Sequence, residues 1–388
     1  MTRDFVKNRV LLTLVILLIA AGSGLAFVSH APNRLISGQG MSLASLLHGI
    51  QWLLLLPVLF LLLFSFFTPS RPNTLIVMLL AEILLFGLTS LTGHTAIALT
   101  SGDEDSVART SLGGAFWACA ALSLLIASDA ISRFTKNHTW RILLNVQVIL
   151  PVVALIVSGQ LSELSLLKEY DNRSDVFNDA LLQHLSILFG TLIPAILLGL
   201  PLGIICHRSA RWQTPILSVL NIIQTVPSIA LFGLLLAPLA GLAKSFPWLA
   251  EHGVSGIGLT PAIIALVLYS LLPLVRGVIA GLNSVLSGVI ESARGMGMNR
   301  VQVFYKVQIP IALPVILTGV RIVAVQTVGM AMVAALIGAG GFGAIMFQGL
   351  LSSALDLVLL GVIPVVLMAV VVDGFFKFLV SMLETSRR

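Results

Sequence analysis

Ten apolar stretches, each long enough to cross a lipid bilayer as a helix, follow one another along this chain of 388 residues. A hydrocarbon core about 30 Å thick needs roughly 20 residues of helix. Because water is absent from that core, each stretch must satisfy its own backbone polar groups, which a helix does. The sequence therefore predicts an all-α polytopic membrane protein with about ten transmembrane helices, at residues 10–28, 50–67, 74–93, 113–130, 142–158, 184–206, 214–242, 259–276, 311–336 and 354–378.

The composition argues against several other classes of protein. Hydrophobic residues make up 57% of the chain and charged residues 10%, against about 45–50% and 25% in soluble domains. The net charge of +6 is better explained by basic residues gathering in cytoplasmic loops than by nucleic-acid binding. Cys119 and Cys206 lack metal-ligand spacing, and no GxxxxGK(S/T) motif is present. We therefore expect no metal, no nucleic-acid partner and no cofactor bound by this chain.

Lysine and arginine are distributed unevenly between the two sides of the predicted spans. With the N-terminus inside, fifteen fall on the inner side and five on the outer side, and Arg276 and Arg321 lie within apolar runs near the inner ends. Positive charge resists translocation across the membrane. We therefore expect both termini in the cytoplasm. The first run is longer than the core of a typical signal peptide, which predicts a retained helix.

A polar segment divides the chain into two sets of five predicted spans. Residues 1–158 form an N-terminal five-span region, residues 159–183 an extracytoplasmic linker, and residues 184–388 a second membrane region. The leucines of the linker have helical spacing, which fits either a short amphipathic element or a plain solvated connection.

Two of the predicted spans are interrupted by proline next to polar residues. Residues 221–233 read NIIQTVPSIALFG, and residues 265–276 read ALVLYSLLPLVR. Proline frees a backbone carbonyl that polar neighbours or a water-filled path must satisfy. Such kinked helices commonly line transport paths, although simple packing kinks remain the alternative. The candidates for pathway lining are Gln224, Thr225, Pro227, Ser228, Tyr269 and Ser270.

Three further features have mainly structural interpretations. Residues 338–343 read GAGGFG, but a dinucleotide-binding fingerprint needs a preceding strand, so we expect a glycine-rich break at the outer membrane surface. Gly199 and Gly203 form a GxxxG motif, which indicates close helix packing. Glu82 lies within a predicted span and fits either a packing role or ion coupling.

The most polar stretch between two late spans is residues 291–310, ESARGMGMNRVQVFYKVQIP. The charge distribution places it in the cytoplasm. Its small residues Ser292, Ala293 and Gly297 would let a short helix enter a cleft on a partner, while Glu291 would cap that helix or pair with a basic group. Pro310 marks the start of the next span.

This stretch resembles the EAA loop of binding-protein-dependent ABC importer permeases. The resemblance consists of Glu291-Ser292-Ala293, then Gly297, then residues 307–310, with serine in place of the first alanine and Val307 and Ile309 in place of the usual isoleucine and leucine. It covers about residues 184–380. Within this region the segments IIQTVPSIALFG, IIALVLYSLLPLVRG and LIGAGGFGAIMFQG resemble permeases for osmoprotectants, and the long N-terminal extension resembles one subgroup of them.

The resemblance implies a transmembrane permease subunit in a bacterial cytoplasmic membrane, with glycine betaine or a related quaternary amine as substrate. It implies a cytoplasmic ABC ATPase dimer that uses the ATP, a periplasmic or lipid-anchored substrate-binding protein, and a second permease subunit, the same or related. The coupling loop would be residues 287–310, with ATPase-coupling residues Glu291, Ser292, Ala293, Gly297, Ile309 and Pro310. The alternatives are a permease for an amino acid such as methionine, an ion-coupled secondary transporter that uses Glu82, and a membrane scaffold or sensor.

Overall fold

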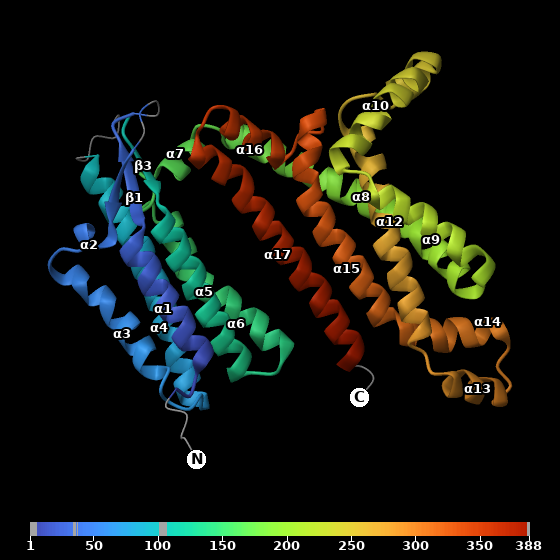
Figure 1. Ribbon diagram of the computed structural model, residues 1–388, viewed down its shortest axis with the longest axis horizontal. Coiled ribbons are helices and arrows are strands. Elements are labelled where there is room, and N and C mark those ends of the chain that lie inside the picture. The colour runs from blue at the N-terminus through green and yellow to red at the C-terminus, as the bar shows by residue number, and fades with distance from the viewer. Residues whose placement is uncertain (1–5, 34–35, 37, 101–106, 386–388) are drawn as a thin grey trace. The chain divides into compact units, whose positions relative to one another are not determined.

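The computed structural model of the chain describes residues 6–33, 36, 38–100 and 107–385. Four basic residues of the sequence count, Arg3, Arg34, Arg387 and Arg388, lie outside these residues. The chain forms two compact units, an N-terminal unit of Met1–Asn172 and a C-terminal unit of Arg173–Arg388. Both units are built mainly from helices (Figure 1).

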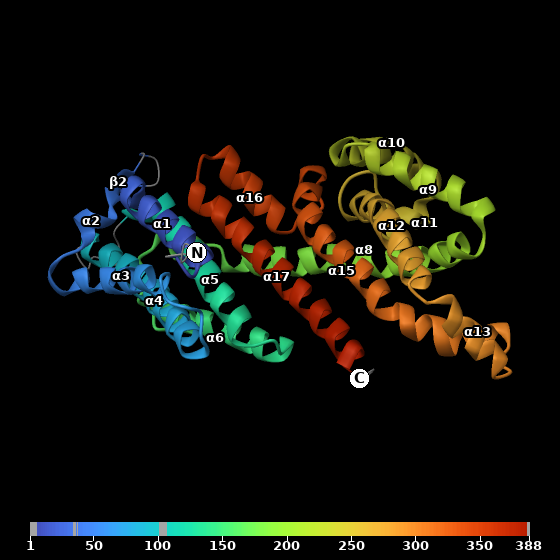
Figure 2. The same cartoon turned by 60° about the horizontal axis from the view of Figure 1, so that its bottom comes forward.

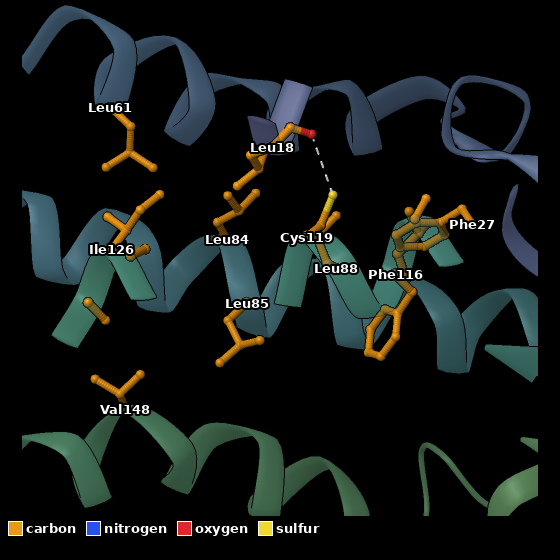
Figure 3. Packing of buried hydrophobic residues seen from close by; sticks show 14 of the residues in the cluster. Leu18, Phe27, Leu61, Leu84, Leu85, Leu88, Phe116, Cys119, Ile126 and Val148 are labelled. Carbon is orange, nitrogen blue, oxygen red and sulfur yellow. Dashed lines mark hydrogen bonds between the residues drawn. The ribbon is translucent and has the colours of Figure 1, made fainter. Parts of the chain in front are cut away.

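The N-terminal unit is a bundle of apolar helices around α4 and α5. Its helices are α1 (Arg9–Gly24), α2 (Leu43–Leu46), η1 (Gly49–Leu54), α3 (Leu55–Phe64), α4 (Arg71–Leu99), α5 (Gly114–Phe134), α6 (His138–Val157) and α7 (Ser165–Asp171). The Ser70 hydroxyl caps α4 by accepting a bond from the backbone N–H of Asn73, and Pro72 occupies the first turn, where a missing N–H does no harm. Leu84, Leu88, Cys119 and other apolar side chains from these helices meet in one core (Figure 3).

A small antiparallel sheet accompanies this bundle, and the sequence patterns did not predict it. Its strands are β1 (Ala26–Ala31), β2 (Gln39–Ser42) and β3 (Arg109–Leu112), in the order β2-β1-β3. The predicted span at residues 10–28 is therefore too long at its C-terminal end, because α1 ends at Gly24 and the chain continues into β1. Strands of four to six residues next to apolar helices cannot be recognised from hydropathy alone.

The C-terminal unit is arranged around α12, most of which is buried. Helices α8, α9, α10 and α15 contact α12, and α17 packs against α15 and α16 (Figure 2). The elements are α8 (Ser174–Arg208), α9 (Ala210–Thr225), α10 (Ser228–Ser245), α11 (Pro247–Glu251), α12 (Leu259–Asn283), α13 (Ser287–Gly295), α14 (Arg300–Val303), η2 (Phe304–Gln308), α15 (Ile309–Ala334), η3 (Ala335–Ile337), α16 (Phe342–Leu351) and α17 (Leu355–Thr385).

Glycines allow α12 to lie close to its neighbours. A Cβ atom at Gly199 would come 2.6 Å from Leu274 Cδ2, and one at Gly203 would come 2.5 Å from Val278 Cβ. These distances are well inside van der Waals contact. The GxxxG motif of α8 is thus the surface on which α12 packs, as the sequence indicated.

The membrane prediction is confirmed in its main features. Among the described residues, eight helices are long and apolar enough to cross a membrane, and the segments Arg9–Gly24 and Gly49–Phe64 are shorter apolar helices that correspond to the first two predicted spans. The predicted span at 214–242 is wrong as a single helix, because the chain breaks between α9 and α10. The predicted start at residue 184 is late, since α8 begins at Ser174.

Candidate functional site

The break between α9 and α10 is the first candidate site. Helix α9 ends at Thr225, and α10 begins at Ser228, with Val226 and Pro227 between them in non-helical conformation. Pro227 has no N–H to continue the hydrogen bonds of α9, and the residue before a proline is biased away from helical conformation, as the extended ψ of 129° at Val226 shows. The carbonyl of Val226 precedes the cap of α10 and therefore needs a partner outside that helix.

Tyr269 on α12 supplies that partner, and Gln224 on α9 in turn bonds to the backbone of Tyr269. The Tyr269 hydroxyl donates a hydrogen bond to the Val226 carbonyl. The Gln224 side-chain amide donates a bond of 3.0 Å to the backbone carbonyl of Tyr269. Pro273 lies four residues after Tyr269 in α12 and has no N–H, so the Tyr269 carbonyl lacks its usual helical donor. Two backbone oxygens left free beside prolines are thus satisfied by one pair of side chains.

A third polar contact extends this interface by one helical turn. Arg276 Nη2 on α12 donates a bond of 2.8 Å to Asn221 Oδ1 on α9. Asn221 and Gln224 are three residues apart and so lie on one face of α9. The two proline-interrupted segments predicted separately from the sequence therefore form one interface.

The remaining pathway candidates make only local interactions. Thr225 is exposed, and its hydroxyl donates to the Ile222 carbonyl at 2.7 Å. Pro227 is exposed and Ser228 is half-buried. Ser270 is buried and donates to the Leu266 carbonyl within α12, at 2.7 Å. Their assignment to a substrate path stays a prediction.

The second candidate site is the segment predicted to dock an ATPase. Glu291, Ser292 and Ala293 lie on α13, the short helix that projects from the end of α12 (Figure 1). Glu291 and Ser292 are exposed, whereas Ala293 is buried. Helix α13 begins at Ser287, so Glu291 is too far along the helix to cap it, and the capping role expected from the sequence is wrong.

Gly297 ends this helix for a conformational reason that the sequence reading missed. Its φ is +85°, in the left-handed region that favours glycine. The N–H of Gly297 bonds to the Arg294 carbonyl at 2.9 Å, and the N–H of Met298 bonds to the Ala293 carbonyl at 3.2 Å. This pair of bonds is a Schellman cap. Because a Cβ at Gly297 would meet nothing within 4 Å, the backbone alone demands glycine here.

The segment after Gly297 is attached to the membrane helices through Phe304. This ring is buried, and the Arg208 guanidinium of α8 lies 4.3 Å from the ring centre. Phe304 begins the π-helical turn η2, after which Ile309 and Pro310 open α15. A wider turn before Pro310 suits a residue that cannot donate to the preceding turn. Neither Arg208 nor Phe304 was predicted from the sequence, in which the one sign of this contact is an aromatic residue, Phe304, inside a polar stretch.

The glycine-rich loop is the third feature that the sequence singled out. Gly338, Gly340 and Gly341 all have positive φ, and the loop follows helical residues rather than a strand. The N–H of Gly341 donates to Gln183 Oε1 at 2.8 Å, which ties the loop to α8. The buried His184 ring contacts the Val328 carbonyl at 3.1 Å.

The C-terminal unit therefore combines helices of membrane-spanning length with a broken helix pair and a short, capped helix after α12. Residues 195–384 match the model of the binding-protein-dependent transport system inner membrane component. Residues 7–167 match the N-terminal domain of ABC transporter permease YehY. The chain belongs to the family of binding-protein-dependent ABC importer permeases.

Named relatives are similar over about half of the chain. The osmoprotectant import permease protein OsmW of Salmonella typhimurium is 39% identical over 191 residues, which are 49% of this chain and 84% of the relative. The carnitine transport permease protein OpuCB of Listeria monocytogenes is 40% identical over 49% of this chain and 80% of the relative. The choline transport system permease protein OpuBB of Bacillus subtilis is 34% identical over 49% and 81%.

A solved structure of the MetNI methionine ABC transporter in an inward-facing conformation is also similar. It is 23% identical, has a TM-score of 0.45, and covers 53% of this chain and 97% of its own. With a TM-score below 0.5, this likeness adds nothing to the choice of substrate.

Proposed function

We propose that this permease subunit conducts a quaternary-amine osmoprotectant such as glycine betaine, choline or carnitine. The support is the set of relatives described for osmoprotectant, carnitine and choline transport, at 34–40% identity over at least 80% of their own lengths. Carnitine and choline share a trimethylammonium group. A path that passes one of them must therefore admit a bulky cation that donates no hydrogen bond from its charged nitrogen.

Substrate recognition belongs to a separate binding protein in this proposal. A quaternary ammonium is held tightly by a cage of aromatic rings. Trp140, Trp212 and Trp248 are 58%, 54% and 58% exposed and lie at or near helix ends, as interfacial anchors do. In this proposal the chain binds the substrate only weakly along its path, and a periplasmic or lipid-anchored binding protein supplies the affinity. A second permease subunit, the same or related, forms the other wall of that path.

The observation that supports ATPase docking is the exposure of large apolar side chains around α13. Leu286 is 74% exposed, Met296 72% and Tyr305 66%, within a stretch that also exposes the polar Glu291 and Ser292. A polar segment that exposes several large apolar side chains is a candidate interaction surface. We infer that a cytoplasmic ATPase dimer covers this surface, with Ala293 and the Gly297 cap shaping the helix that it receives.

The mechanism follows from how this segment is connected. ATP binding closes the ATPase dimer, and α13 passes that movement through Phe304 into α15 and through the Arg208 contact into α8. The break at Val226–Pro227, held to α12 by Gln224 and Tyr269, is the place where α9 and α10 can change their relative angle. ATP is needed because a ligand alone shifts two conformations only by its differential affinity for them. The N-terminus and C-terminus lie in the cytoplasm in this scheme.

Uptake by the complex reconstituted in proteoliposomes tests the proposal. Labelled glycine betaine, choline, carnitine and methionine are offered with the binding protein outside and ATP inside. We expect ATP-dependent uptake of at least one quaternary amine and none of methionine. Uptake of methionine alone would overturn the substrate assignment while leaving the importer class intact.

The same vesicles discriminate the ion-coupled alternative. A protonophore should leave uptake unchanged, whereas an ATPase variant unable to hydrolyse ATP should abolish it. The reverse pattern would show secondary transport. Absence of any uptake by an assembled complex would favour the scaffold or sensor alternative.

A further inference from the structure

The N-terminal unit contains an apolar cavity of about 200 Å³, open on one side, that is lined by residues of α1, α2, η1, α3, α4 and α5. Leu18, Leu84, Leu88 and Cys119 form its back wall, and each is no more than 5% exposed. Figure 3 shows these four side chains directed toward one another from three helices. The cavity lies wholly within this unit and far along the chain from the predicted transport and coupling residues.

Apart from the half-exposed Trp52 indole, the lining presents no free polar group to an occupant. The other lining side chains with a hydrogen-bonding atom are Ser23 and Cys119, and both are already bonded. The Ser23 hydroxyl donates to the Ile19 carbonyl at 2.8 Å, and the Cys119 thiol donates to the Leu18 carbonyl at 3.7 Å. Water needs two to four polar partners to occupy a cavity, and apolar cavities of this size stay dry. The occupant that fits is an apolar one.

The mouth of the cavity opens at the surface of the helix bundle. Ile19, Trp52 and Leu55 also line it, and they are 44%, 50% and 40% exposed. In a chain that spans a membrane, exposed apolar surface faces lipid tails, and tryptophan favours the level of the headgroups. A tail can therefore enter beside Trp52 while its headgroup stays at the membrane surface.

We propose that this cavity is a binding site for one acyl chain of a membrane phospholipid. The tail would fill the space between α1 and the α4–α5 pair and make the dispersion contacts that an empty cavity forfeits. Because the lining has no basic residue to pair with a phosphate or carboxylate, the site selects the tail and not the headgroup.

The test is photochemical labelling of the full-length protein in bilayers. The probe is phosphatidylethanolamine with a diazirine in one acyl chain, and adducts are mapped by peptide mass spectrometry. We expect adducts on Leu88 and Cys119, which line the cavity and are only 2% and 1% exposed. Ile126 is 1% exposed, lies outside the lining and should carry none, whereas Leu125, 55% exposed, should be labelled throughout.

A matched pair of variants on α1 separates the cavity from general lipid contact. A side chain at Gly22 would start 3.6 Å from Cys119 Sγ and 3.7 Å from Leu43 Cδ2, so Gly22→Leu should fill the cavity and abolish the adducts on Leu88 and Cys119. Gly24 has nothing within 4 Å of its Cβ position, so Gly24→Leu should keep them.

Two results would overturn the proposal. One is wild-type labelling confined to exposed residues, as expected if another protein segment or nothing fills the cavity. The other is unchanged labelling of Leu88 and Cys119 in Gly22→Leu. If that variant does not fold, Ala44→Phe, at a lining residue on α2, provides the same test.

Discussion

The side-chain amide of Gln224 on α9 donates a 3.0 Å hydrogen bond to the backbone carbonyl of Tyr269 on α12, the one carbonyl that Pro273 leaves without its helical donor. The Tyr269 hydroxyl donates in turn to Val226 at the break between α9 and α10. A proline in one helix is therefore compensated by a side chain from another. These two hydrogen bonds to α12 therefore hold the break between α9 and α10 in place.

Gln224→Leu should destabilise the protein by ~1–3 kcal/mol, the usual cost of leaving a buried polar group without its partner. Thermal unfolding of the purified protein in detergent measures this change. Thr225→Val is the control, because the Thr225 hydroxyl is exposed and bonds only to Ile222 in its own helix, so its loss should matter little.

The Pro273→Ala background tests the reason for that cost. Alanine restores an N–H at position 273 that can bond to the Tyr269 carbonyl, so Gln224→Leu should cost less there than in the native background. Equal costs in the two backgrounds would show that the Gln224 side chain is not compensating for the proline.

Gly297→Ala and Gly295→Ala should have opposite effects, although both sites have open space for a Cβ. Gly297 has φ of +85°, where an L-residue costs ~1–2 kcal/mol. Gly295 is the last helical residue of α13, where alanine gains up to ~1 kcal/mol. Hydrogen exchange over residues 287–299 measures the local effect, and copurification with the ATPase measures docking.

Substitutions at Gly297 also separate shape from charge. Asparagine tolerates positive φ, so Gly297→Asn should dock better than Gly297→Ala. Gly297→Asp adds a charge at the partner surface and should block docking or coupling while membrane insertion stays normal. Normal association and transport by Gly297→Asp would contradict the docking assignment.

Met296→Ser and Tyr305→Ser should weaken ATPase association without destabilising the permease. These side chains are 72% and 66% exposed, so the permease alone gains little from them. If a partner buries them, each is worth roughly 1.5–3 kcal/mol, which corresponds to about ten- to a hundredfold in affinity. Ile257→Ser, at a residue 68% exposed in the loop before α12, is the control and should leave association unchanged.

The membrane helices could be predicted from the sequence because apolar runs of spanning length have few other uses. What failed were the ends and breaks. The hydropathy of residues 214–242 is continuous across Pro227, so the run appeared as one span, although the proline was recognised as a kink. The strand β1 continues an apolar run from α1, so hydropathy alone did not distinguish the two.

The candidate site was predictable in its residues but not in its pairing. Gln224 and Tyr269 were each singled out because they stand beside prolines, yet their sequence separation gives no sign that one satisfies the carbonyl freed by the other's helix. Gly297 was chosen for its small size, whereas its positive φ depends on the cap geometry. Arg208 lies far from Phe304 in sequence, so their contact needed the fold.

Glu82 on α4 accepts a 2.6 Å hydrogen bond from Gln147 on α6, and within the described part of the chain Glu82 Oε2 and Gln147 Oε1 are buried without a hydrogen-bond partner. Glu82→Gln keeps an acceptor for Gln147 and adds a donor for its free oxygen, so stability should be maintained or raised. Glu82→Leu strands the Gln147 amide and should cost ~1–3 kcal/mol in thermal unfolding. If the pair serves packing, both variants should retain ATP-driven uptake per folded complex. Loss of uptake in the stable Glu82→Gln variant would instead show that the acid takes part in transport.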